Sequence, residues 1–460
     1  MLGIYFILPR LARNFWLLAM SLLFYTWGEH MFVVVFLVSM TVNFFAGLVI
    51  HWCREWRHVK WLLWSNIAAN LALLIFYKYS GFLAANLNAL LAAAHLPLIR
   101  IHDTHLPFGI SFFTFHAISY VVDVYCGNAR VQKNPLNFFL YESLFPQLIA
   151  GPIIRYRDIG EQIDRRRETL SGFAYGVIRF VTGLSKKMLV ANLLAVKADT
   201  IFTLPAGGLS AGVAWLGAIC YTLQIYFDFS GYSDMAIGLG HMLGFQFVEN
   251  FNYPYISRSI QEFWRRWHIS LSTWFRDYLY IPLGGSRVSP FRTYVNLVTV
   301  FFLCGLWHGA SWNFVIWGML HGAFLVLERQ KWMAWLDRVW APLRHGYALL
   351  VIIVGWVFFR SNDLGNALDF LHAMCGGGHA ADAPAANPAM YLDGPTVAAL
   401  CAAVAGSMPV LKIVSSVANR APALYVPVAL GRIVALSVLF VLCAIQLASG
   451  TYNPFIYFRF

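Results

Sequence analysis

The chain has 460 residues, of which 59% are hydrophobic, 17% aromatic and only 12% charged. A soluble protein carries about 25% charged residues, so this composition excludes a soluble globular enzyme, a disordered chain and a coiled coil. It indicates a polytopic membrane protein whose solvent is mostly lipid. The formal net charge of +12 fits membrane topology and anionic lipid headgroups, so the lipid bilayer is an expected partner and nucleic acid is not.

The seven cysteines lie far apart, and no two have the spacing of a CxxC motif. Their number is odd, so we predict neither a disulfide framework nor a metal site. We also expect no permanently bound cofactor. The first residues lack a basic segment before their apolar run, which is not the pattern of a cleaved signal peptide.

Hydrophobic runs recur along the whole chain, from the N-terminus onward. A membrane-crossing helix needs about 20 mostly apolar residues, with about 17 as a lower limit, and several runs are shorter. We therefore predict an all-α polytopic transmembrane helical bundle with about 10–13 hydrophobic segments, some of them re-entrant. The candidate runs are 14–28, 31–50, 61–77, 80–94, 108–125, 138–154, 173–196, 211–228, 229–248, 294–310, 312–327, 347–360, 396–411 and 427–447.

The basic residues predict how these runs are oriented, because Lys and Arg favour the cytoplasmic side. They gather in segments 51–60, 155–168, 257–292 and 329–344, whereas segment 361–394 contains none. Within one membrane domain over 1–460, we expect a cytoplasmic interfacial segment at 255–292 and an external, flexible Gly/Ala/Pro-rich loop at 361–394. The alternation fails by one crossing between 171 and 249, so run 229–248 is not expected to cross simply.

Polar islands interrupt the hydrophobic runs, and an ionisable group inside a membrane is costly enough to be a functional candidate. The first island, 224–234, contains Asp228 and Asp234, with a helix break expected at Gly231. It predicts either a polar wall that orients a catalytic base or a hydrogen-bond network that locks helices together. A further island at 106–123 contains His116. It predicts either the lining of a tunnel or hydrogen bonds between helices.

The second island, 257–278, has apolar residues every three or four positions, which predicts one amphipathic helix. Arg265, Arg266 and Arg276 would form a basic face that attracts a polyanionic donor such as coenzyme A. Anchoring in lipid headgroups is the alternative. His268 is the residue of this island that we single out as a catalytic candidate.

The third island contains His308 and His321, each followed by glycine. An imidazole exchanges a proton near neutral pH, so His308 is the candidate general base, with room for substrate beside Gly309. On one continuous helix the two rings would lie about 220° apart, so a shared site requires a bend near 309–313. Supporting candidates are Asp228, Ser311, Asn313 and His321.

Four of these segments resemble the membrane-bound O-acyltransferase (MBOAT) family, and within it the bacterial branch of alginate O-acetylation proteins. They are QIYFDFSGYSDMAIG at 224–238, FWRRWHISLSTWFRDYLYIPLGG at 263–285, GLWHGASW at 305–312 and residues 317–322. Segments 106–123, 146–155 and 455–460 are also similar. The start departs from this pattern, because relatives usually have a longer hydrophobic segment before Leu8-Pro9.

The resemblance implies a helical bundle with a central tunnel in the bacterial inner membrane. His308 matches the family's proposed catalytic histidine, and His268 matches a second polar position on the cytoplasmic side of the tunnel. Acetyl groups would come from a cytoplasmic donor, acetyl-CoA, and pass to periplasmic O-acetyltransferase partners that modify an exported polysaccharide.

We therefore expect an O-acetyltransferase in which His308 takes a proton from a hydroxyl that attacks the thioester. An acetyl-histidine intermediate is the variant. Alginate or a similar exopolysaccharide is the expected acceptor, with peptidoglycan and cellulose as alternatives. There are two competing classes of protein. One is a transporter or flippase for a polar lipid or sugar, and the other is a scaffold of a secretion complex.

Overall fold

The computed structural model describes residues 1–100, 105–205, 208–377, 387–410, 414, 416 and 422–450. Over these residues the chain is helical and contains no strand, which confirms the all-α prediction. It divides into two compact units. Unit 1 comprises Met1–Gly176 and Leu239–Val248, and unit 2 comprises Val177–Gly238 and Glu249–Phe460.

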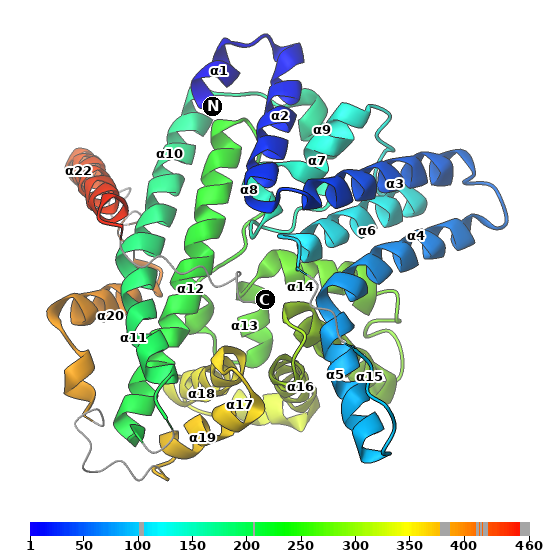
Figure 1. The fold of residues 1–460 in the computed structure, drawn as a ribbon. Coiled ribbons are helices and arrows are strands. Elements are labelled where there is room, and N and C mark those ends of the chain that lie inside the picture. The colour runs from blue at the N-terminus through cyan, green and yellow to red at the C-terminus, as the bar shows by residue number, and fades with distance from the viewer. Residues whose placement is uncertain are drawn as a thin grey trace. The chain divides into compact units, whose positions relative to one another are not determined.

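Unit 1 is built mainly from the N-terminal helices (Figure 1). These are α1 (Leu2–Ile7), α2 (Arg10–Glu29), α3 (Phe32–Trp52), α4 (Val59–Leu74), the π-helix η1 (Ile75–Tyr79), α5 (Ser80–Ala93), α6 (Ile110–Cys126), α7 (Pro135–Ser143), α8 (Phe145–Leu148) and α9 (Tyr156–Arg165). Two helices belong partly to each unit, α10 (Leu170–Ser185) and α12 (Ala211–Met242).

Unit 2 contains the remaining elements. They are η2 (Lys186–Ala191), α11 (Asn192–Phe202), η4 (Pro254–Ile256), α13 (Ile260–Arg266), α14 (Ile269–Phe275), η5 (Arg276–Tyr280), α15 (Pro290–His308), α16 (Trp312–Leu327), η6 (Glu328–Trp332), α17 (Met333–Leu336), α18 (Ala341–Arg360), α19 (Leu364–Met374), η8 (Pro388–Tyr391), α20 (Gly394–Gly406) and α22 (Pro422–Ala448).

Among the described residues, four helical stretches are long and apolar enough to cross a membrane. They are Phe32–Trp52, Val59–Ala93, Ala341–Arg360 and Val426–Ala448. The predicted runs 61–77 and 80–94 lie in one of these stretches, which bends at η1 between α4 and α5 (Figure 1). A π-helical turn inside an α-helix is a recognised cause of such a bend.

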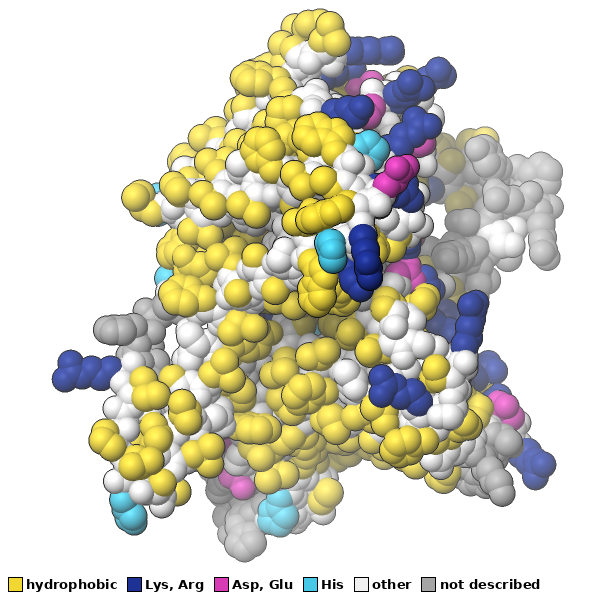
Figure 2. All heavy atoms as spheres, turned by 90° about the vertical axis from the view of Figure 1, so that its right-hand side faces the viewer, with side chains coloured by type: hydrophobic (Ala, Val, Ile, Leu, Met, Phe, Trp, Pro, Cys, Tyr) yellow, Lys and Arg dark blue, Asp and Glu magenta, His cyan; other side chains and the backbone are white. Residues whose placement is uncertain are grey.

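The surface has the composition expected next to lipid. Figure 2 shows a face that is mostly hydrophobic, with Lys and Arg gathered mainly toward one side. Leu11 and Trp27 are 97% and 83% exposed, and many other large apolar side chains are exposed too. Apolar surface on this scale is not stable in water, so lipid must cover it.

Segment 361–394, expected as an external loop, contains helix α19 and the short helix η8. Asp363 caps α19 by accepting a hydrogen bond from the Asn366 backbone N–H at 2.8 Å. The central part of the Gly/Ala/Pro-rich stretch, 378–386, lies outside the described residues, as does segment 455–460. The external location of this segment stays a prediction.

The helix break expected at Gly231 is wrong, because α12 continues through it. The glycine serves close packing instead. A Cβ on Gly231 would lie 2.8 Å from the Gly183 carbonyl oxygen, and one on Gly183 would lie 2.5 Å from the Gly231 carbonyl oxygen. Small residues let two helix backbones approach, here α10 and α12, and this is a common device in membrane helices.

The bend that a site shared by His308 and His321 requires near 309–313 is present. Helix α15 ends at His308, Gly309 is extended, and α16 begins at Trp312. The two helices then pack closely through glycines. A Cβ on Gly305 would collide with the Phe314 carbonyl oxygen, and one on Gly318 would collide with the Phe301 carbonyl oxygen.

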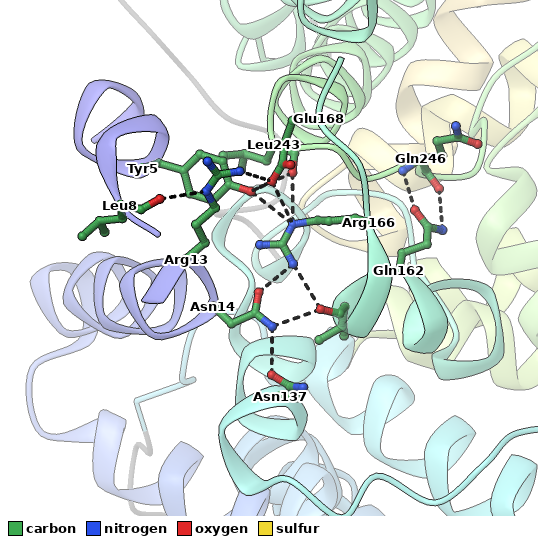
Figure 3. A network of polar contacts seen from close by, with 11 residues as sticks. Tyr5, Leu8, Arg13, Asn14, Asn137, Gln162, Arg166, Glu168, Leu243 and Gln246 are labelled. Atoms are coloured by element: carbon green, nitrogen blue, oxygen red, sulfur yellow. Dashed lines mark hydrogen bonds and ion pairs between the residues drawn. The ribbon is translucent and has the colours of Figure 1, made fainter. Parts of the chain in front are cut away.

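Unit 1 is held together by a polar network around Glu168 (Figure 3). The Tyr5 hydroxyl donates to Glu168 Oε1 at 2.6 Å, and Arg13 forms an ion pair with the same oxygen at 3.0 Å. Arg166 donates through Nε to the Tyr5 hydroxyl oxygen and to the Leu243 carbonyl oxygen. The network therefore joins α1, α2, the segment after α9 and the residues that follow α12.

We predict that Gly318→Ala destabilises unit 2, because the added methyl group forces α15 and α16 apart. The expected cost is about 1–3 kcal/mol, measured as a lower midpoint of thermal unfolding in detergent. Gly346→Ala in α18 is the matched control, since a Cβ there meets nothing within 4 Å. Equal melting of both variants would contradict the packing argument.

We predict that the network around Glu168 stabilises the protein only while this residue is ionised. Partial burial opposes ionisation, but hydrogen bonds from Tyr5, its own backbone and Arg13 outweigh it and lower the pKa of Glu168 below its ordinary value of 4.5. The stabilisation is therefore complete above pH 4.5 and is lost as the pH falls through the lower pKa of the folded state. The test compares the midpoint of thermal unfolding of wild type with that of Glu168→Gln, at pH 6.5 and below pH 4. The wild type should unfold at a higher temperature at pH 6.5, and the difference between the two midpoints should shrink on acidification.

Candidate active site

The site is assembled in unit 2 from a broken helix and a helical hairpin. The predicted single helix over 257–278 is wrong. Helix α13 ends at Arg266, Trp267 is extended, and α14 begins at Ile269. Between them, His268 adopts a left-handed backbone conformation, with φ of 42°. This conformation costs a non-glycine residue free energy, so other contacts must hold His268 in it.

The start of α13 is fixed by Glu328, the residue after α16. Its Oε1 accepts a hydrogen bond from the Ile260 backbone N–H at 2.6 Å, and Oε2 accepts one from Gln261 N–H at 2.8 Å. The Tyr347 hydroxyl donates to Oε1 at 3.2 Å. A buried carboxylate thus satisfies N–H groups that a helix start always leaves open.

His268 is fully buried, and its ring lies against aromatic neighbours. Its centroid is 4.6 Å from that of Phe229, in an edge-to-face arrangement, and 6.2 Å from that of Trp307. Nδ1 lies 3.1 Å from Asn250 Oδ1. Burial lowers the pKa of His268 to about 3, so the ring is neutral at physiological pH.

His308 is the last residue of α15 and is enclosed by aromatic rings. The centroids of Trp307, Trp317 and Phe359 lie 4.9, 4.9 and 5.1 Å from the centroid of the His308 ring, all edge-to-face. The His308 side chain is buried.

The bend between α15 and α16 places both histidines of the third island beside one ring. Trp317 lies 4.9 Å from His308 and 5.0 Å from His321, measured between ring centroids. His321 also packs edge-to-face on Trp264 of α13, at 5.3 Å. The rings of all three candidate histidines are therefore linked through Trp307 and Trp317.

The glycine after His308 does not provide space for substrate. A Cβ on Gly309 would collide with the Phe314 ring, so that space is already filled. This part of the prediction is wrong, and the glycine serves helix packing. His116 belongs to α6 of unit 1, where it is fully buried.

The supporting candidates have partners of their own. Asp228 forms an ion pair with Lys187 at 2.6 Å, and both side chains are buried. Asn313 donates through Nδ2 to the Ser361 carbonyl oxygen at 2.9 Å. Ser311 precedes α16 as its N-cap residue. Their role in orienting His308 stays a prediction.

Two of the three arginines proposed to attract the donor are paired with carboxylates. Arg266 forms an ion pair with Glu262 at 2.9 Å, and Arg276 forms one with Asp277 at 2.7 Å. Arg265 is exposed. The two carboxylates cancel the net positive charge that Arg266 and Arg276 would otherwise add, so Arg265 is the strongest of the three candidates.

Sequence reasoning missed three residues that shape this site: Lys187, Asn250 and Glu328. Lys187 and Glu328 could have been found from the sequence, because one lies within an apolar run and the other at the end of one. A charged residue in such a place is costly in lipid and is therefore a functional candidate. Asn250 had no such signal, since its partners are distant in the sequence. Among the described residues, no three His, Cys, Asp or Glu side chains gather as metal ligands.

Comparison with known proteins identifies the family. The profile of the membrane-bound O-acyltransferase family, MBOAT, matches residues 102–360, more than half of the chain. The chain belongs to the membrane-bound O-acyltransferase family. It is accordingly an acyltransferase located in a membrane.

Several curated relatives of this MBOAT protein align over most of its length. The chain is 46% identical over 375 residues to the probable alginate O-acetylase AlgI of Azotobacter vinelandii, covering 81% of this chain and 74% of the relative. The probable alginate O-acetylase AlgI of Pseudomonas putida is 44% identical, with 81% and 77% covered. The peptidoglycan O-acetyltransferase of Helicobacter pylori is 38% identical over 410 residues, with 81% and 76% covered.

We predict that Asp228 is part of a helix-locking ion pair. Asp228→Asn removes the carboxylate partner of buried Lys187 and should cost about 3–5 kcal/mol of stability. The double variant Lys187→Met, Asp228→Leu replaces the pair by apolar groups and should recover both the melting temperature in detergent and the activity. A stable but inactive double variant would contradict this expectation and favour an orienting role for Asp228.

Proposed function

We propose that this MBOAT protein transfers acetyl groups from cytoplasmic acetyl-CoA across the bacterial inner membrane, for O-acetylation of an exported polysaccharide. The observation that carries the proposal is the buried group of three histidines joined by tryptophans on α13–α16. Imidazoles in a buried, aromatic site suit proton transfer to and from a hydroxyl. A multi-pass position in the inner membrane and a periplasmic O-acetyltransferase partner are parts of the same proposal.

In the proposed reaction, His308 takes the proton from an incoming hydroxyl. The hydroxyl oxygen then attacks the thioester carbonyl, and the C–S bond breaks to release the coenzyme A thiolate. The proton held by His308 passes to this leaving sulfur. A covalent variant, in which a His308 ring nitrogen attacks the thioester first, gives an acetyl-histidine that can be trapped in the absence of acceptor.

The donor side of the proposal rests on the α13–α14 segment. Arg265 is exposed on it and can attract the phosphates of coenzyme A, while His268 lies buried at its break. We propose that this segment faces the cytoplasm, in line with the basic residues of 257–292.

Alginate or a similar exopolysaccharide is the acceptor that we favour. The support is the name of several relatives at 43–46% identity, each a probable alginate O-acetylase. The second candidate is peptidoglycan, supported by the 38% identity to the Helicobacter pylori protein.

We predict that His308→Ala abolishes acetylation without loss of protein. The test is complementation of an alginate-exporting strain that lacks its own O-acetylation membrane protein, with the acetyl content of the alginate measured by NMR. Loss of a positioned base should lower the rate by about 10²–10⁴-fold. His372→Gln, an exposed histidine of α19, is the control and should behave as wild type.

Two outcomes would overturn parts of this proposal. Normal acetylation by His308→Ala at normal membrane abundance would remove His308 from the mechanism. Unacetylated alginate in cells that express wild type, together with newly acetylated muropeptides, would assign peptidoglycan as the acceptor.

A further inference from the structure

Asn250 lies in the segment between α12 and η4 and is 1% exposed. Two helices of unit 2, α12 and α14, contact its side-chain amide. Oδ1 accepts hydrogen bonds from the Ser270 backbone N–H at 3.2 Å and from Ser270 Oγ at 2.9 Å. Nδ2 donates to Ser233 Oγ of α12 at 3.2 Å. Its backbone carbonyl oxygen also accepts from Ile269 N–H at 3.0 Å.

These contacts determine which way the amide points. The Ser270 backbone N–H can only donate, so the atom facing it must be the amide oxygen. The reverse orientation would set two donors against each other in a buried place, which is costly. Amide oxygen and nitrogen atoms are similar in size, so their hydrogen-bond partners must tell them apart. Here the partners identify the atom that faces Ser270 as the oxygen Oδ1.

The amide orientation in turn determines the tautomer of His268. Asn250 Oδ1 lies 3.1 Å from Nδ1 of this ring and can only accept, so Nδ1 must carry the hydrogen. A neutral imidazole has one protonated nitrogen, which leaves the lone pair on Nε2. Nε2 is buried and has no hydrogen-bond partner among the described residues.

The ring cannot easily turn to exchange its two nitrogens. Phe229 lies edge-to-face against it, and Trp307 lies on another side. The strained backbone of His268 is held by the same residue, because Asn250 accepts from the next two backbone N–H groups, those of Ile269 and Ser270.

We propose that Asn250 is a positioning residue of the acyltransferase. It holds His268 as the Nδ1-protonated tautomer and so presents Nε2 as a hydrogen-bond acceptor for an O–H or N–H group of the substrate. This inference rests on the proposed function only for its catalytic consequence. The tautomer itself follows from the contacts of Asn250.

The kinetic test compares Asn250→Ala with Asn250→Asp in purified protein in detergent, with acetyl-CoA as the probe and thiol release as the readout. Asn250→Ala should lower kcat by about 10–100-fold, the size seen when a group that orients a functional histidine is removed. Asn250→Asp retains the acceptor and should restore most of kcat. Its carboxylate stabilises the imidazolium, so the acidic limb of the kcat/KM profile should move to higher pH.

Asn296→Ala is the matched control, because Asn296 is an equally buried asparagine of the same unit. Its Nδ2 donates to the carbonyl oxygens of Leu283 and Gly285. This variant should melt at a lower temperature with an unchanged pH profile. Wild-type kcat in Asn250→Ala, or an unshifted acidic limb in active Asn250→Asp, would overturn the inference.

A spectroscopic readout separates this inference from the proposed function. Nitrogen-15 spectra of histidine-labelled protein, with His268→Gln subtracted, report which ring nitrogen of His268 is protonated. We expect a single Nδ1-protonated form in wild type and a mixture in Asn250→Ala. If wild type releases no thiol, the proposed function fails while this spectrum still decides the tautomer; an Nε2-protonated ring in wild type overturns the inference.

Discussion

Buried polar groups in this protein must find their partners inside the helical bundle, because lipid offers none. The break between α13 and α14 depends on this constraint. Glu328 satisfies the N–H groups at the start of α13, and Asn250 satisfies those at the start of α14. Without them, the broken helix would leave its backbone donors unpaired. The position of His268 is therefore a consequence of two distant polar side chains.

Close backbone packing is the second condition, and it places His308. Glycines at the α15–α16 contact leave no space for a Cβ, so the hairpin closes tightly. The tight hairpin sets Trp317 between His308 and His321. A membrane protein gains little from hydrophobic association of helices within lipid, so van der Waals packing through small residues has a larger share. Gly309, which suggested space for substrate, is likewise packed, against the Phe314 ring.

The buried charged side chains also find their partners inside the helical bundle. Asp228 and Lys187 lie next to a second group, in which Arg179 and Lys186 bind Asp234. Each carboxylate is neutralised within unit 2, along the contact between α10, η2 and α12. Such pairing lets this chain hold ionisable groups in an apolar bundle without exposing an uncompensated charge to lipid.

The sequence by itself determined the class of the protein. Composition and the length of the apolar runs excluded a soluble fold, and helical geometry showed that a site shared by His308 and His321 would require a bend at 309–313. The motifs around His268 and His308 also pointed to the family. These features are local: they depend on residue type and on spacing along one segment, which helical geometry converts directly into structure.

Only the tertiary structure decided where helices break and what each polar side chain contacts. The stripe over 257–278 predicted one helix, but contacts from Asn250 and Glu328 favoured two. Gly231 suggested a break, but packing against Gly183 kept α12 continuous. In both cases a contact between residues distant in the sequence outweighed local propensity. The physical reason is that the free energy of a buried hydrogen bond or a tight helix contact depends on the partner, and the partner is not visible in the local sequence.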